Sequence, residues 1–262
     1  MDLGLKGKAA LVTGATSGMG LGIAKVLAEE GCNVMITGFG EAKEIERLKA
    51  EIAGKHGVKV LHDPVDLAHE DQVVKMVQNT EKAFGAVDIL INNAGIQHVA
   101  LVEEFPVERW DALLAVNLTA AFHAIRTAMP GMKKRNWGRI VNNASASGLA
   151  ASPKKTAYTA AKFGLIGLTK AVALEVAENK ITCNAICPGW VLTGMSRPQV
   201  EVIAQREGVS FEQASKILLS TQPNKRFITP EEIGRFVAYL CSEAASPITG
   251  AALSIDGGIM AG

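Results

Sequence analysis

Tyr158 and Lys162 stand four residues apart in the run AYTAAK, a combination that can move a proton. Residues at this spacing share one face of a helix. A tyrosine with its usual pKa of about 10 is a poor base at neutral pH, and a nearby ammonium lowers that pKa. The pair predicts a tyrosine that exchanges a proton with an alcohol or a ketone while a hydride moves to or from a nicotinamide. An ordinary helix pair is the alternative, because the spacing is common.

Two serines, Ser145 and Ser147, precede this pair in the stretch NASASG (143–148). A serine hydroxyl close to the tyrosine could hydrogen-bond the oxyanion that develops on the substrate. A serine that only shapes a turn is the alternative. Residue types alone do not say which serine takes part in the chemistry.

A glycine-rich loop, TGATSGMG, follows the first apolar run. Its GxxxGxG spacing allows a tight turn and a close approach of the backbone to a pyrophosphate at the N-terminus of the next helix. Such a loop in the first β-α unit predicts a dinucleotide site. The candidate ligands are Thr13, Gly14, Thr16, Ser17, Gly18, Met19 and Gly20.

The end of the second apolar run reads Gly38-Phe39-Gly40 and carries neither an acid nor a base. A basic residue there would favour NADP and an acid NAD. Lys43 is the nearest cation, and without an arginine to meet a 2′-phosphate we expect NAD. Phe39 either packs on the adenosine or is a core aromatic.

Two further strand ends could contact the dinucleotide. Asp66-Leu67 could meet the adenine, although an aspartate there is also a good helix N-cap. The stretch NNAG closes the fourth apolar run, and its Asn93, Ala94 and Gly95 suit a backbone packed close to a ligand.

Short apolar runs alternate with longer helical patterns along the chain, which is typical of a parallel sheet covered on both faces. Helices are expected at 41–56, 69–84 and 156–179. The pattern predicts an α/β fold, a Rossmann-type doubly wound parallel sheet of about seven strands, in a single domain of residues 1–262. Residues 193–228, here called the lid segment, form a helical insertion over the edge of the sheet where ligands bind. Strands are expected at 8–13, 33–37, 58–62, 87–92, 139–144, 181–186 and 251–255.

Composition excludes several classes of protein. The chain has 262 residues and a net charge of +1, which argues against nucleic acid as a partner. No apolar segment reaches the roughly 20 residues of a membrane span, and the start of the chain lacks a signal peptide. The four cysteines form no CxxC pair and the five histidines no metal-ligand spacing, so no metal is expected. We expect a soluble, cytoplasmic protein with reduced thiols.

Six motifs, in order, resemble those of the short-chain dehydrogenase/reductase family. They are TGxxxGxG at 13–20, NNAG at 92–95, Asn117 in AVNLTA, a serine 13 residues before a tyrosine, YxxxK at 158–162 and PGWVLT at 188–193. The resemblance implies that Tyr158 is the acid/base, that Ser145 polarises the carbonyl, and that Lys162 holds the nicotinamide ribose and lowers the tyrosine pKa. It also implies that Asn117 supports a water-linked proton relay. The nicotinamide carboxamide would face Pro188, Gly189, Val191 and Thr193.

Within that family the chain is similar to the bacterial (R)-3-hydroxybutyrate dehydrogenases, in residues 92–118, 38–40, 185–190 and the terminal ITG…DGG. The resemblance implies NAD-dependent oxidation of (R)-3-hydroxybutyrate, or a related short 3-hydroxyacid, to acetoacetate. It implies a carboxylate site at Gln97, Lys155 and Gln199, with Trp190 as a wall and His98 shaping the loop. Ser147 departs from the subgroup, which has a histidine there, so the chain length of the acid stays open.

Two other functions remain as alternatives: an NADPH-dependent reductase of 3-oxoacyl thioesters or another ketone, and a dinucleotide sensor without turnover. Family members of this kind are usually homotetramers, and the apolar helix at 156–179 would supply an interface. Direction of flux and a structural ion at the C-terminus also stay open.

Overall fold

Seven parallel strands form one sheet in the computed structural model, which describes residues 2–261. The strand order is β3-β2-β1-β4-β5-β6-β7, so the order reverses between β1 and β4. Ligands bind at such a switch point in doubly wound sheets. The predicted fold class and all seven predicted strands are confirmed, with ends that differ by a few residues. The strands are β1 (Ala9–Val12), β2 (Asn33–Thr37), β3 (Val60–Asp63), β4 (Ile89–Asn92), β5 (Gly138–Asn143), β6 (Ile181–Pro188) and β7 (Ala252–Ile255).

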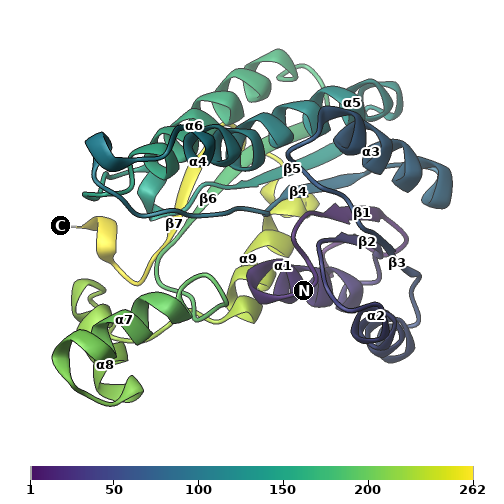
Figure 1. Cartoon of the computed structure of the whole chain (residues 1–262). Helices are drawn as coiled ribbons and strands as arrows, with labels where there is room; N and C mark the ends of the chain where they lie inside the picture. The colour runs from purple at the N-terminus through teal and green to yellow at the C-terminus, as the bar shows by residue number, and fades with distance from the viewer. Residues whose placement is uncertain (1, 262) are drawn as a thin grey trace.

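Helices cover both faces of the sheet (Figure 1). In that view α1, α2 and α9 lie below it, and α3, α5 and α6 lie above it. Because both faces are covered, the central strands β1, β4, β5 and β6 are buried along their whole length. The helices are α1 (Gly18–Glu29), α2 (Ala42–His56), α3 (Glu70–Phe84), α4 (Val107–Leu114), α5 (Ala120–Arg135), α6 (Thr156–Glu175), α7 (Arg197–Glu207), α8 (Phe211–Leu218) and α9 (Pro230–Cys241).

The α6 helix ends at Glu175, four residues before the end that the apolar pattern predicts. Its C-terminal residues continue as tight turns, in which Ala177 N–H donates to the Leu174 carbonyl and Asn179 N–H to the Val176 carbonyl. The other two predicted helices, α2 and α3, begin one residue later than expected and end where expected.

The helical stretch Val107–Arg135 is long and apolar enough, by length and composition alone, to cross a membrane. The search for unbroken apolar runs in the sequence did not find it, because charged residues are scattered among its apolar ones. The core helix of a protein outside the membrane can pass the same test. The stretch comprises α4, a π-helical turn (Ala115–Thr119) and α5. Small side chains of α5, such as Ala120 and Ala124, pack in the core beside the sheet, as in helices of proteins that do not span membranes.

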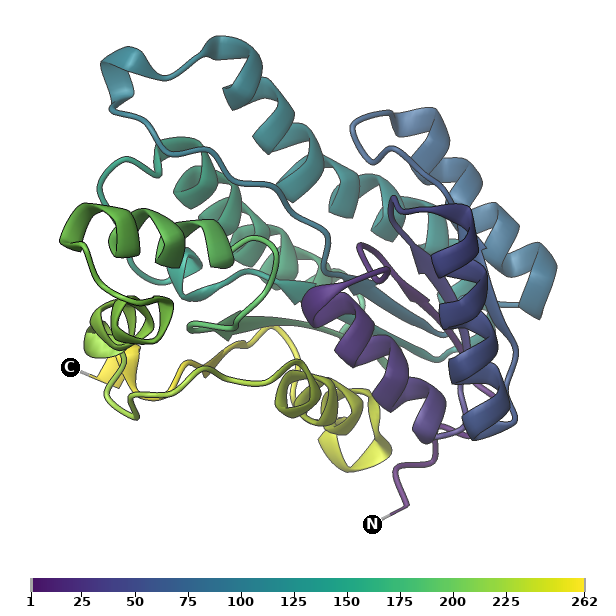
Figure 2. The same cartoon turned by 60° about the horizontal axis from the view of Figure 1, so that its bottom comes forward.

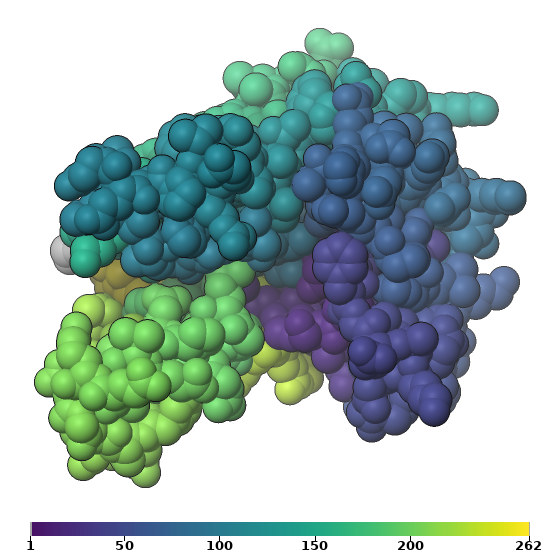
Figure 3. Space-filling model, viewed as in Figure 1, coloured from purple at the N-terminus to yellow at the C-terminus, as the bar shows by residue number. Residues whose placement is uncertain are grey.

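The lid segment leaves the sheet after β6 and returns before α9. Its two ends are held together by a bridge between Val191 and Ile228, where Ile228 N–H donates to the Trp190 carbonyl over 2.9 Å. Figures 1 and 2 show α7 and α8 standing off the sheet beside the C-terminal turn. The predicted helical insertion is therefore confirmed. Figure 3 shows a hollow between this insertion and α2, and its lining includes Gly18, Thr193 and Arg197.

Candidate active site

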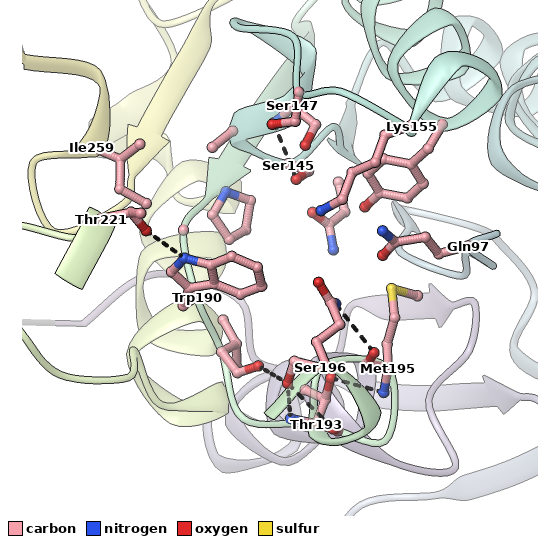
Figure 4. Close-up of a pocket in the computed structure, with 18 of the residues that line it drawn as sticks. Gln97, Ser145, Ser147, Lys155, Trp190, Thr193, Met195, Ser196, Thr221 and Ile259 are labelled. Carbon is pink, nitrogen blue, oxygen red and sulfur yellow. Dashed lines mark hydrogen bonds between the residues drawn. The ribbon is translucent and has the colours of Figure 1, made fainter. Parts of the chain in front are cut away.

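One cavity of about 310 Å³ lies between the ends of the strands and the lid segment (Figure 4). All seven residues expected to meet the substrate line it, together with the four expected to meet the nicotinamide and one residue of the glycine-rich loop, Met19. The seven come from five separate parts of the chain, which parallel strands bring to one edge. They are Gln97, Ser145, Ser147, Lys155, Tyr158, Trp190 and Gln199, and the four are Pro188, Gly189, Val191 and Thr193.

Tyr158 and Lys162 are both buried on the inner face of α6, with 8% and 3% of their surface exposed. The Lys162 ammonium lies 5.5 Å from the centre of the Tyr158 ring and donates a 2.7 Å hydrogen bond to the Asn143 carbonyl. Burial disfavours the charged form and lowers the pKa of Lys162 to about 8.

The pKa of Tyr158 moves in the direction opposite to the one expected from the spacing. Burial of the phenol raises it, and a hydrogen bond with Ser145 opposes that rise. The phenol therefore starts neutral, which is the form that donates a proton to a ketone oxygen.

Ser145 lies two residues after the end of β5 and has an unusual backbone conformation, with φ 70° and ψ 158°. This region is essentially reserved for glycine, because a Cβ crowds the backbone there. The Ser145 hydroxyl also accepts a 3.3 Å hydrogen bond from Ser147 N–H at the start of a short 3₁₀ turn. Ser145 thus shapes a turn and faces the cavity at once, so the two interpretations of this serine do not exclude each other.

Asn117 lies in the π-helical turn and ties the loop after β4 to the helix. Its side-chain oxygen accepts from Ile96 N–H over 2.8 Å, and its amide donates to the Ile96 carbonyl over 2.9 Å. Asn117 is 2% exposed, and π-helical turns of this kind are often found at functional sites. The contact fixes the backbone next to Gln97.

Gln97 and Lys155 form the polar end of the cavity. The Gln97 amide nitrogen is buried and has no hydrogen-bond partner within residues 2–261. The Lys155 ammonium lies 5.5 Å from the Trp190 ring centre, and partial burial lowers the pKa of Lys155. A carboxylate would pair with the amide and the ammonium together.

The glycine-rich loop fits a dinucleotide. A Cβ on Gly14 would lie 2.9 Å from the Ala94 Cα, so this glycine permits the close approach of two strand ends. Thr13 and Asn93 hold these ends together, since Thr13 Oγ1 accepts from the N–H groups of Asn93 and Ala94 over 3.0 Å. The N–H groups at the start of α1 receive no side-chain cap from Ser17, as a site for a phosphate requires.

The structure excludes one alternative each for Phe39, after β2, and Asp66, after β3. Phe39 is 71% exposed, so it is not a core aromatic. Its carbonyl accepts a 2.9 Å hydrogen bond from Thr16, and Gly38 has a φ of 138° that only glycine adopts readily. Asp66 is not the N-cap of α3, because that helix begins at Glu70 and the Asp66 carboxylate accepts from Ala68 N–H instead.

Sequence reasoning missed two buried residues that support the cavity wall. The Gln222 side chain accepts from Trp190 N–H over 2.8 Å and donates to Asn224 and to the Arg226 carbonyl. Asp256 accepts from the N–H groups of Gly258 and Met260, each over 2.9 Å. Neither stands in a recognisable spacing, and only their burial in the fold identifies them.

The histidines and cysteines lie outside this cavity. His98 packs edge-on against Phe105, with ring centres 5.3 Å apart, as a loop-shaping residue would. All four cysteines are buried and unpaired. Among residues 2–261, no group of three or more His, Cys, Asp and Glu is arranged to hold a metal.

Comparison with known proteins identifies the family. A family profile described as enoyl-(acyl carrier protein) reductase matches residues 14–260. The chain is 52% identical over 259 residues to the D-beta-hydroxybutyrate dehydrogenase of Cupriavidus necator, covering 98% of this chain and 99% of that protein. It is 49% identical over 252 residues to the protein of the same name from Rhizobium meliloti, covering 96% and 98%.

A solved structure with the same fold is L-sorbose reductase from Gluconobacter frateurii, complexed with NADPH and L-sorbose. It matches with a TM-score of 0.94 and 32% identity, over 99% of each chain. Sequence, fold and site geometry agree, and the chain belongs to the short-chain dehydrogenase/reductase family of oxidoreductases.

Proposed function

We propose that this enzyme oxidises (R)-3-hydroxybutyrate, or a closely related short 3-hydroxyacid, to the 3-ketoacid with NAD, and that the reaction is reversible. The observation that carries the proposal is the shared cavity. Tyr158 and Ser145 face the same space as the Lys155 ammonium and the unpartnered amide of Gln97. A hydroxyacid presents a reacting hydroxyl to the first pair and a carboxylate to the second. The names of the two bacterial relatives support the same activity.

In this mechanism the substrate hydroxyl lies between Tyr158 and Ser145. Ser145 donates a hydrogen bond to the substrate oxygen. In reduction the neutral Tyr158 phenol gives its proton to the ketone oxygen. In oxidation the phenol first loses its proton through the water-linked relay at Asn117, and the phenolate then takes the hydroxyl proton. Gln199, on the lid segment, is the third polar residue for the carboxylate. The bound nicotinamide supplies the hydride acceptor or donor.

Lys162 supports the proton transfer from behind the tyrosine. In the proposed complex its ammonium holds the ribose hydroxyls of the nicotinamide, and Asn117 keeps the loop of Gln97 in place. The water-linked relay expected at Asn117 is part of this proposal. A small cavity beside Asn117, of about 10 Å³, is close to the size that admits one water molecule.

NAD is the proposed dinucleotide. Gly38 and Phe39 present only backbone atoms and a neutral side chain. The 2′-phosphate of NADP is usually bound by a cationic side chain, which neither residue supplies, so NAD is favoured. The L-sorbose reductase of similar fold holds NADPH, so the family's fold alone does not select the dinucleotide. Initial rates with NAD and NADP at equal concentrations test this point. A higher kcat/KM with NADP would contradict it.

The cofactor contacts that follow from the family motifs are part of the same proposal. They include Thr16, Gly18 and Gly20 for the phosphates, Phe39, Asp66 and Leu67 for the adenosine, and residues 93–95 and 188–193 for the nicotinamide side. The lid segment would close over the acid, because Gln199 projects from it into the cavity.

The decisive experiment is a panel of (R)- and (S)-3-hydroxyacids, with reduced nicotinamide measured by absorbance. Turnover of the (R)-acids with NAD is expected. No turnover of any hydroxyacid would refute the proposal, and a preference for NADPH with 3-oxoacyl thioesters would select the reductase alternative. A thioester lacks the carboxylate that Lys155 and Gln97 are arranged to bind. Binding of NAD without turnover of any acid or ketone would identify a sensor.

We further propose a cytoplasmic homotetramer. Large apolar side chains are exposed on α5, at Phe122, and on α6, at Phe163 and Leu174, and a subunit interface would cover such side chains. Four buried free thiols suit a reducing compartment. Light scattering after size exclusion gives the mass, and a monomer would contradict the assembly.

A further inference from the structure

We infer that Gln222 is a positioning residue for the substrate acid. From behind the cavity wall, its side-chain amide fixes Trp190 next to the Lys155 ammonium and so sets how tightly the acid binds. The inference rests on the proposed function and deepens it. Trp190 and Lys155 line the cavity, and Gln222 acts on the acid only through them.

An amide is the group that the surroundings of the Gln222 side chain require. The residue is 0% exposed, and its side chain meets one donor and two acceptors. Its Oε1 accepts from Trp190 N–H over 2.8 Å, and its Nε2 donates to Asn224 Oδ1 over 2.8 Å and to the Arg226 carbonyl. A carboxylate would supply no donor for the two oxygens, and a hydrocarbon would leave all three groups unpaired.

Trp190 is anchored by the returning end of the lid segment. Its N–H is held by Gln222, its carbonyl accepts from Ile228 N–H over 2.9 Å, and its indole N–H donates to Thr221 over 3.2 Å (Figure 4). The ring centre lies 5.5 Å from the Lys155 ammonium, whose charge is attracted to the face of the ring. The anchors on Trp190 therefore also determine where this ammonium stands in the cavity.

Gly189 shows how closely the amide packs on the wall. A Cβ on Gly189 would lie 2.6 Å from Gln222 Oε1 and 2.8 Å from the Asp256 carbonyl oxygen. The Gly189 N–H donates to the Ile255 carbonyl over 3.1 Å. The backbone before Trp190 is thus confined between the amide and the end of β7, and loss of the amide would free it on one side.

The turn that carries Gln222 is itself held from two sides. Asn224 N–H donates to the Gly257 carbonyl over 3.1 Å, which ties the turn to the segment after β7. The Arg226 guanidinium forms hydrogen bonds of 2.8 and 2.7 Å with the Glu232 carboxylate in the first turn of α9. Because the turn is fixed to β7 and α9, the amide can hold the wall rather than follow it.

The first test is Gln222→Met, which removes the amide and keeps an unbranched side chain. KM for (R)-3-hydroxybutyrate should rise by about ten-fold, as expected when one hydrogen bond is lost and a buried partner stays unpaired. Tyr158 and Ser145 belong to other parts of the wall, so kcat should change by less than about three-fold. A merely destabilised enzyme has fewer active molecules, which lowers kcat and leaves KM unchanged, and that result would overturn the inference.

Arg226→Met is the matched control in the same turn. It removes an exposed ion pair with Glu232 but keeps the carbonyl that Gln222 binds, so KM should stay within about two-fold of the wild type. A KM raised as much as in Gln222→Met would show that any damage to this turn has the same effect. If thermal unfolding shows that Gln222→Met does not fold, Gln222→Asn takes its place, because its amide is one methylene too short for Trp190 N–H.

Tryptophan fluorescence tests the positioning without turnover. A released Trp190 ring meets more water, so the emission of Gln222→Met should shift to longer wavelength. The same replacement in a Trp190→Phe background leaves only Trp110 and Trp137 and should cause no shift. An unshifted emission in the first case, or a shift that persists in the second, would refute the role of Gln222. If the wild type oxidises no (R)-3-hydroxyacid, the proposed function fails, and this measurement still decides whether Gln222 holds Trp190.

Discussion

Replacing Ser145 by glycine is expected to stabilise the folded protein relative to replacement by alanine, although both changes remove the same hydroxyl. The Ser145 backbone, at φ 70° and ψ 158°, lies where a residue with a Cβ is strained. Alanine keeps the Cβ and the strain, and glycine removes both. The hydrogen bond from Ser147 N–H to the serine oxygen is lost in both variants, so it cancels in the comparison.

The magnitude follows from two opposing terms. A residue forced into this region costs about 1–3 kcal/mol. Glycine also lowers the free energy of unfolding by about 0.5–1 kcal/mol, because it gives the unfolded chain more conformational freedom than alanine does. The glycine variant should therefore be more stable than the alanine variant by about 1–2 kcal/mol. For a chain of this length, that corresponds to a rise in Tm of a few degrees.

The assay is urea unfolding of both variants at one protein concentration, because stability of an oligomer depends on concentration. The m values should agree, so that the difference lies in the midpoint. An alanine variant as stable as the glycine variant would refute the strain at Ser145. Both variants should lose about 100- to 1000-fold in kcat, as expected when one hydrogen bond to a developing oxyanion is removed.

Three further changes test other parts of the site. Lys162→Met should make the free energy of unfolding less dependent on pH. Between the folded pKa of about 8 and the usual 10.5, Lys162 binds a proton in the unfolded chain but not in the folded one. The free energy of unfolding of the wild type therefore rises by about 3 kcal/mol as pH rises through this window, and that of the variant does not. Urea midpoints of both proteins across that range measure it, and parallel curves would contradict the lowered pKa. Tyr158→Phe should lower kcat by about 100- to 10,000-fold while NADH still binds, as measured by NADH fluorescence; near-normal turnover would exclude Tyr158 as the acid/base. Phe39→Arg should raise kcat/KM with NADP by about ten-fold or more, since an arginine can pair with a 2′-phosphate, and an unchanged value would show that this position does not meet the ribose.

The periodicity of the chain was sufficient to predict the sheet. Buried parallel strands are continuously apolar, so all seven could be read from the sequence, and strand–helix alternation restricts their order to few possibilities. The end of α6 was less predictable, because the apolar pattern continues past Glu175 into turns. The mean hydropathy of the helical stretch Val107–Arg135 was not apparent from unbroken apolar runs, because charges interrupt its apolar residues.

The candidate site divides in the same way. Tyr158 and Lys162 could be identified because a helix places residues four apart on one face. Ser145 was chosen over Ser147 only through the resemblance to the family, which has a serine 13 residues before the tyrosine. Gln222 and Asp256 could not be identified, because their role depends on which backbone groups the folded chain brings beside them.

By itself, therefore, the sequence determined the order of the elements, the dinucleotide loop and the residues able to exchange a proton with an alcohol. The tertiary structure alone decided the upward direction of the Tyr158 pKa and the strained backbone of Ser145, since desolvation and crowding arise only after distant segments pack. It also decided what surrounds Ser147. In the sequence Ser147 is a small polar residue in a turn, and in the fold it lines the same cavity as Ile259.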